Sequence, residues 1–213
     1  MNTLTVIDKI DVTFEGPFTL CSEESDAIFL SQGSLDGACG YYSTMMCLII
    51  SGVISRDDAL NGLTSLLDGR TNMGKLTSRM KSHKFFDGTF DSDIVELFDG
   101  VFSKELAVYS NNYTSVSPRS FIVEHLQNNN PVMIAIEWGD GAHWVVAVGM
   151  DYVGDSDDKE ILRFLILDPA GDIVRCCAWN NLLEAIPNGG QYPYMYHGQG
   201  KVKMRDAVAF VAL

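Results

Sequence analysis

The sequence predicts an α+β fold within a single domain, residues 1–213, in which a helical half packs on an antiparallel sheet. Helix start and stop signals concentrate in about residues 1–130. Three β-rich runs follow in quick succession in about residues 131–213, and their short connections favour antiparallel pairing. A chain of 213 residues is long enough to bury one sizeable core.

The first half opens with a weakly alternating run, residues 4–14, which predicts a strand, and a short apolar extended segment at 27–31. Residues 39–54 are apolar almost all round, which predicts a helix buried on most sides. The next helix is expected at 55–69, where Ser55 with Asp58 forms a capping signal.

Residues 70–100 are polar and broken by glycines, which predicts a loop with a short helix. A strand is expected at 105–110, and a helix at 117–130 that starts with Ser-Pro and ends in three Asn. The strands expected in the second half cover 131–138, 143–153, 161–168, 172–179 and 206–213.

Composition excludes several classes of function. The net charge is −13 and the isoelectric point about 4.5, so a nucleic acid or an anionic membrane surface would be repelled. The five cysteines are odd in number and the four histidines are dispersed, which favours reduced thiols and predicts neither a metal site nor a cofactor. The start of the chain has no signal-peptide pattern, so we expect a cytoplasmic protein.

Cys39 is the first candidate functional residue. It follows a glycine-rich turn in "GSLDGACGYYS" and stands at the start of a predicted helix. A helix N-terminus stabilises a thiolate through its dipole and its unpaired backbone N–H groups, so the position predicts a reactive thiol. Two other interpretations remain open. A cysteine taken alone is more often inert core, and the nearby Asp36 either raises the pKa of the thiol or caps the helix.

His143 and Asp168 lie at the same end of a predicted hairpin. If the turn "GDSDDKE" is centred between Asp155 and Ser156, the two residues stand directly opposite each other. Opposed residues of an antiparallel pair share a face, with Cβ atoms about 4.5–5.5 Å apart. The carboxylate would then orient the imidazole and stabilise its charged form, and the imidazole would activate the Cys39 thiol.

A substrate carbonyl attacked by this thiol also needs hydrogen-bond donors for its developing oxyanion. The backbone N–H of Cys39 supplies one donor, and the side-chain amide of Gln32, seven residues upstream, is within reach to supply a second.

Taken in chain order, the Gln, the Cys-Gly at a helix start, the strand-opening His-Trp and the strand-closing Asp-Pro-Ala-Gly resemble the papain-like cysteine peptidases. The resemblance is greatest to the leader-processing peptidase domains of bacteriocin exporters, which cleave after a Gly-Gly pair. It implies a papain-like fold, with Cys39 as nucleophile, His143 as base, Asp168 as the residue that orients it and Gln32 as oxyanion donor.

The resemblance implies a cysteine peptidase acting on a protein or peptide substrate, with Gly-Gly as a candidate cleavage sequence. A thiol-dependent amidase, glutamine deamidase or transglutaminase-like acyl transferase would use the same residues, and a non-catalytic binding module is a further alternative. Since nothing in residues 1–26 resembles an inhibitory pro-segment, we expect an interbacterial toxin or effector held in check by a basic immunity protein, with a processing enzyme as the alternative.

Overall fold

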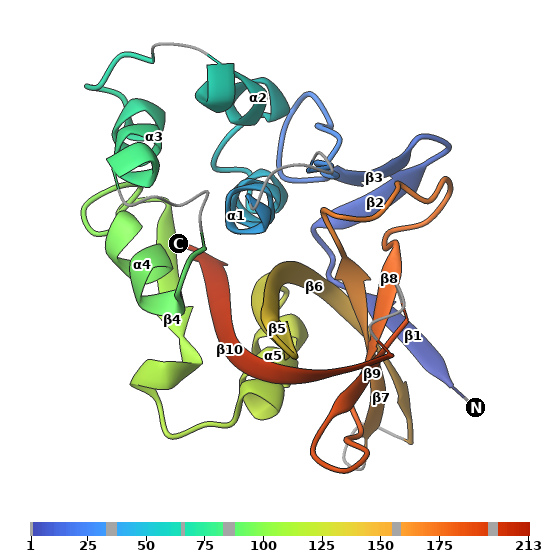
Figure 1. Cartoon of the computed structure of the whole chain (residues 1–213). Coiled ribbons are helices and arrows are strands. Elements are labelled where there is room, and N and C mark those ends of the chain that lie inside the picture. The colour runs from blue at the N-terminus through green and yellow to red at the C-terminus, as the bar shows by residue number, and fades with distance from the viewer. Residues whose placement is uncertain (1, 33–37, 65–66, 83–87, 155–158, 196–199) are drawn as a thin grey trace.

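The computed structural model describes residues 2–32, 38–64, 67–82, 88–154, 159–195 and 200–213, and everything below refers to these residues (Figure 1). The chain is 26% helix and 36% strand. Its centre is a closed antiparallel barrel of six strands in the order β6-β5-β10-β9-β8-β7, which closes because β7 pairs back with β6. The barrel strands are β5 (Val132–Trp138), β6 (Gly141–Val153), β7 (Glu160–Leu167), β8 (Asn181–Glu184), β9 (Tyr192–Tyr194) and β10 (Gly200–Ala212).

The prediction of a papain-like fold, with a helical half packed on an antiparallel sheet, is wrong, because the sheet closes on itself as a barrel. Two strands of 13 residues, β6 and β10, allow this closure, since each pairs with successive partners along its length. The first part of β6 pairs with β5 and the second part with β7. Similarly, β10 pairs first with β9 and then with β5, across a register shift between Met204 and Ala207.

The strands predicted in the first half of the chain form, but two of them join the sheet of the second half, which the division at residue 130 did not predict. β1 (Thr3–Val6) pairs with β6, and β4 (Leu106–Ser110) pairs with β10, so both extend the barrel sheet. β2 (Ile10–Thr13) and β3 (Gly16–Thr19) form a separate two-stranded hairpin.

Five α-helices and a 3-10 turn within the described residues pack around the barrel. They are α1 (Cys39–Ile50), α2 (Arg56–Thr64), α3 (Asn72–Ser82), α4 (Asp91–Leu97), η1 (Asn111–Tyr113) and α5 (Pro118–Gln127). α1 packs against β6 and β5, α4 against β4 and β10, and α5 against β10, β6 and β5. α1 carries no charged residue and is buried along almost its whole length, as its apolar sequence predicts.

Several predicted elements are confirmed. α1 begins at Cys39, and the capping box of α2 forms, since Ser55 Oγ accepts from the Asp58 N–H at 3.1 Å and Asp58 Oδ2 accepts from the Ser55 N–H at 3.2 Å. Ser117 caps α5 by accepting a hydrogen bond from the backbone of Ser120. The strands expected near residues 105–110, 131–138, 143–153 and 161–168 also form.

Other elements differ from the prediction. Residues 172–179 form no strand, and β8 begins only at Asn181 because this segment is a loop folded around Asp168. Residues 27–31 contribute a single bridge, between Ala27 and Phe18. The segment 70–100 holds two helices, α3 and α4, in place of one.

Candidate active site

Polar side chains from four neighbouring strands of the barrel converge at one place. His143 lies near the start of β6, Asp168 follows the last residue of β7, Asn181 opens β8 and Tyr194 ends β9. In the barrel the order of these strands is β6, β7, β8, β9, each paired with the next. Closure of the barrel therefore brings together residues that are far apart in the sequence.

His143 and Asp168 form the central contact of this cluster, with Nε2 of the imidazole 2.7 Å from Oδ1 of the carboxylate. The predicted contact is present, although the predicted register is wrong. Val146 pairs with Leu167, so continuing the ladder would place residue 168 opposite Val145. Because 143 and 145 lie on the same face of the strand, His143 is a diagonal neighbour and still reaches Asp168.

Asp168 is 2% exposed, and each of its carboxylate oxygens accepts two hydrogen bonds. Oδ1 accepts from His143 and from the backbone N–H of Ala170 at 2.8 Å, while Oδ2 accepts from the Tyr194 hydroxyl at 2.6 Å and from Asn181 Nδ2 at 3.2 Å. Burial by itself raises the pKa of Asp168, but hydrogen bonds from His143, Tyr194 and Ala170 and the imidazole charge bring that pKa below its ordinary value. The acid is therefore held as a carboxylate.

The backbone of Asp168 is fixed as firmly as its side chain. The side-chain amide of Asn180 accepts from the Asp168 N–H at 2.7 Å and donates to the Asp168 carbonyl at 2.9 Å. This paired contact, together with the bond from Ala170, explains why the turn after β7 presents the carboxylate toward His143.

Cys39 is the second hydrogen-bond partner of the His143 ring. Since Nε2 of the ring is bonded to Asp168, Nδ1 is the nitrogen available for the hydrogen bond with the Cys39 sulfur. Burial raises the pKa of Cys39, but the hydrogen bond and charge of His143, with backbone hydrogen bonds from Trp144 and Gly40, outweigh burial and lower that pKa below its ordinary value.

The same contacts act on the imidazole in the opposite sense. Burial lowers the pKa of His143, but hydrogen bonds and charge from Asp168 and Cys39 raise it to about 9. A thiol with a lowered pKa beside an imidazole with a raised pKa is the arrangement in which the proton moves from sulfur to the ring. The three residues thus form a continuous Cys39–His143–Asp168 chain.

The start of α1 leaves backbone donors near the sulfur. The N-cap is Ala38, which has no side chain able to cap the helix, and the first helical hydrogen bond runs from the Tyr42 N–H to the Ala38 carbonyl. Asp36, the alternative cap, lies outside the described residues. The backbone of Gly40 at this helix start bonds the Cys39 sulfur, which stabilises a negative charge there.

α1 is attached to β6 next to the site. The hydroxyl of Ser43, one helical turn after Cys39, donates to the carbonyl of Trp144 at 3.0 Å, and the backbone N–H of Trp144 bonds the Cys39 sulfur. Ser43 therefore bonds the carbonyl of Trp144 and Cys39 bonds its N–H, and Trp144 directly follows His143.

Gln32 lies beside the turn that carries the acid. Its backbone N–H donates to the carbonyl of Pro169 at 2.8 Å, and its side chain is half-buried. The side-chain oxygen Oε1 is buried and makes no hydrogen bond with the described residues. The structure thus brings Gln32 near Asp168, and its service as an oxyanion donor stays a prediction.

One tryptophan ring packs beside the imidazole and another lies next to it in the sequence. Trp144, which follows His143, is buried and donates from its indole Nε1 to the carbonyl of Thr89 at 2.9 Å. The ring beside the imidazole is Trp138, whose centroid lies 6.4 Å from that of His143. Two of the four histidines, His83 and His197, lie outside the described residues.

The remaining cysteines differ from Cys39. None of the five forms a disulfide. Cys47 is fully buried, and burial raises its pKa well above the ordinary value, so it is an unreactive core residue. Cys176 and Cys177 lie on the loop before β8, not on the expected strand.

The sequence did not reveal the residues that hold the acid and the helix: Asn180, Asn181, Tyr194 and Ser43. The adjacent asparagines after the Asp-Pro turn are a weak signal, since Asn side chains often bond nearby backbone. Tyr194 and Ser43 had no signal, because their partners lie on strands distant in the sequence.

Comparison of the chain with protein-family models and with curated proteins finds no match. Within the described ranges, no group of three or more His, Cys, Asp or Glu side chains is arranged to hold a metal ion. Across the same residues, the helices are all too short or too polar to cross a bilayer.

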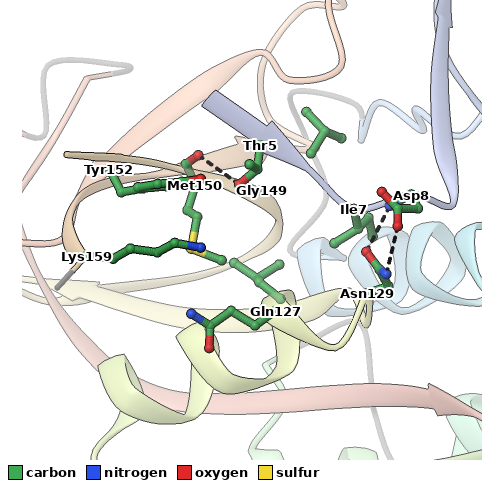
Figure 2. A pocket seen from close by; sticks show the side chains of 11 residues that line it. Thr5, Ile7, Asp8, Gln127, Asn129, Gly149, Met150, Tyr152 and Lys159 are labelled. Atoms are coloured by element: carbon green, nitrogen blue, oxygen red, sulfur yellow. Dashed lines mark hydrogen bonds between the residues drawn. The ribbon is translucent and has the colours of Figure 1, made fainter. Parts of the chain in front are cut away.

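A pocket of about 440 Å³ lies elsewhere, between β1, the second part of β6 and the end of α5 (Figure 2). Lys159 Nζ stands 4.6 Å from the centre of the Tyr152 ring on one side of it, and Asp8 and Asn129 exchange two hydrogen bonds of 3.0 Å on the other. None of the candidate catalytic residues lines this pocket, so it is separate from the site.

Proposed function

We propose that the chain is a cysteine peptidase that hydrolyses peptide bonds of a protein or peptide substrate. One observation carries the proposal: the hydrogen-bonded chain from Cys39 through His143 to a buried Asp168. The order of Gln32, Cys39, His143 and Asp168 along the sequence, which resembles that of the leader-processing peptidases, supports it as well.

In the proposed mechanism the thiolate of Cys39 attacks the scissile carbonyl carbon, forming the C–S bond as the carbonyl π electrons move to oxygen. The backbone N–H of Cys39 and the side-chain amide of Gln32 donate to that oxyanion. When the tetrahedral intermediate collapses, the C–N bond breaks and the His143 imidazolium protonates the leaving amine.

The thioester is then hydrolysed with His143 acting as a base, the reverse of its role as an acid in the first step. Neutral His143 takes a proton from water, the resulting hydroxide attacks the thioester carbon, and the C–S bond breaks to regenerate the thiolate of Cys39 with an imidazolium beside it. Asp168 stays a carboxylate throughout and stabilises the imidazolium.

A preference for small residues before the scissile bond, as in Gly-Gly, is part of the proposal. It rests on the resemblance of the motifs alone. Reporter peptides ending in Gly-Gly and in Ala-Phe test it, and equal cleavage of both would indicate a site without this restriction.

Acyl transfer or amide hydrolysis on a side chain would use the same thioester. The contacts of Cys39 fit an amidase, a glutamine deamidase or a transglutaminase-like enzyme as well as they fit a peptidase. The substrate decides between them, because a peptidase creates new termini whereas the others change side-chain mass.

For the biological setting, we propose a toxin or effector that acts in a cytosol and is inhibited by a separate immunity protein. The net charge of −13 favours an inhibitor with a basic face. Expression of the wild type and of Cys39→Ala in a bacterial cytosol tests this, since growth arrest by the wild type alone is expected and harmless expression of an active enzyme would favour a processing peptidase.

The catalytic proposal is tested by incubating wild type and Cys39→Ala with a mixed protein extract and sequencing the products by mass spectrometry. New termini that depend on Cys39 are expected. Side-chain deamidation or cross-links without new termini would favour the acyl-transfer alternatives, and no thiol-dependent change together with no labelling by a thiol-directed activity probe would indicate a binding module.

A further inference from the structure

The buried carboxylate of Asp168 has two oxygens with different tasks. Oδ1 faces the imidazole of His143 at 2.7 Å. Oδ2 faces away from it and accepts from the Tyr194 hydroxyl at 2.6 Å and from Asn181 Nδ2 at 3.2 Å. The Tyr194 bond is the shortest that the carboxylate makes.

Tyr194 is built into the barrel. It is 5% exposed, it ends β9, and it pairs with Gly200 of β10 and with Leu183 of β8. Its backbone is therefore held between two neighbouring strands, and its hydroxyl reaches a carboxylate that belongs to the turn after a third strand, β7.

We propose that Tyr194 is a positioning residue that holds Asp168 ionised and turned toward His143. The inference rests on the proposed function, because it gives Tyr194 a role in the same site. The hydroxyl stabilises the charged form of the acid, and it fixes the carboxylate plane so that Oδ1 faces the ring. Asn181 adds a weaker donor to the same oxygen, since its bond is longer.

Among the described residues, the titratable groups that face Asp168 are His143 from β6 and Tyr194 from β9, with Cys39 of α1 beyond the imidazole. Tyr194→Phe removes the hydroxyl and keeps the ring. The charged carboxylate then loses a donor in a buried site, so Asp168 takes up a proton at a higher pH than in the wild type.

The test follows the Nε2–H signal of His143 in protein labelled with ¹⁵N-histidine, assigned by its absence in His143→Gln. Acidification protonates Asp168 and removes the hydrogen bond, so the signal is lost at a characteristic midpoint. Tyr194→Phe is expected to raise this midpoint by about one pH unit, and Asn181→Ala to raise it by less.

Tyr192→Phe is the matched control, because Tyr192 is half-buried on the same strand and its hydroxyl is not among the described donors to Asp168. It should leave the midpoint unchanged. A midpoint in Tyr194→Phe equal to that of the wild type, with only a lower melting temperature, would show a merely structural role and overturn the proposal.

If Tyr194→Phe fails to fold, 3-fluorotyrosine in place of tyrosine keeps the ring and makes the hydroxyl a stronger donor, so the midpoint should fall, and an unshifted midpoint there overturns the proposal too. The titration uses neither substrate nor thiol chemistry. A shifted midpoint therefore supports the positioning role of Tyr194 even if Cys39→Ala and wild type prove equally inactive. The positioning role and the proposed peptidase activity are thus tested separately.

Discussion

Ser43 donates a hydrogen bond to the carbonyl of Trp144 at 3.0 Å, and this joins the nucleophile's helix to the strand of the imidazole. Ser43 is fully buried, and the residue it binds directly follows His143 in the sequence. The distance between Cys39 and His143 is therefore set by a contact one helical turn away from the sulfur.

Ser43→Ala should lower stability and thiol reactivity together. The change leaves the buried Trp144 carbonyl without its donor, which costs about 1–3 kcal/mol in the free energy of unfolding. Urea unfolding and the rate of Cys39 alkylation measure the two effects. Thr44→Val is the control, because the Thr44 hydroxyl donates to Gly40 of its own helix at 2.7 Å. If the control slowed alkylation as much as Ser43→Ala, the bond to Trp144 would not be what positions the thiol.

Cys39 should react faster with iodoacetamide than the other four cysteines near neutral pH, by about tenfold or more, because the neighbouring imidazole of His143 lowers its pKa. Cys47 should react last, since it is fully buried. A brief labelling pulse followed by peptide mapping gives the order. Preferential labelling of the exposed Cys21 or Cys176 would contradict the assignment of the nucleophile.

Substitutions in the chain of three residues should differ in severity. Cys39→Ala and His143→Ala are expected to leave no activity above background, whereas Asp168→Ala should reduce kcat/KM by roughly 10³- to 10⁴-fold, because the acid orients and supports the base without touching substrate. Reporter-peptide kinetics measure the series. An Asp168→Ala enzyme with unchanged kcat/KM would remove Asp168 from the mechanism.

Stability should depend on pH through His143. Its pKa is raised to about 9 in the folded chain, from an ordinary value near 6.5. A group with a raised folded pKa contributes its full stability below the unfolded pKa and loses it as pH rises through the folded pKa. Because the pKa of Cys39 is lowered, its titration contributes in the opposite sense, so the comparison is made in Cys39→Ala: there the melting temperature should fall as pH rises above about 6.5, and this fall should be absent in Cys39→Ala/His143→Gln. Identical profiles for the two proteins would contradict the raised pKa.

Gly141→Ala should disturb the imidazole through Trp138. A Cβ at position 141 would lie 2.8 Å from Cε2 and Nε1 of the indole, closer than real contacts allow, so the ring must move. We expect a loss of about 1–3 kcal/mol in the free energy of unfolding and slower alkylation of Cys39. Gly69→Ala, where no atom lies within 4 Å, is the control and should change neither measurement.

Local signals predicted much of this molecule. The buried helix that begins at Cys39, the cap at Ser117 and the strand that carries His143 each follow from a short run of sequence. The neighbourhood of His143 and Asp168 could also be predicted, because a hairpin with a short turn brings its two ends together. The observed register differs from the predicted one by two residues, but His143 and Asp168 stay on one face, since residues two apart along a strand share that face.

Closure of the barrel could not be predicted in this way. It depends on β6 and β10 bending enough to serve successive partners, and on the pairing of β9, three residues long, with both β8 and β10. These pairings join segments distant in the sequence, and no local pattern encodes them. The donors from Asn181 and Tyr194 reach Asp168 only through this closure, so they could not be predicted either.

Because the candidate site draws on four consecutive strands of a closed ring, it should not survive in a partly melted molecule. Opening any of these strand pairs separates a donor from the acid or the acid from the base. Heat inactivation should then coincide with cooperative loss of the barrel, and amide protons of β6 to β9 should exchange through the same global event. Fragments or circularly permuted forms should be active only where they restore the whole ring.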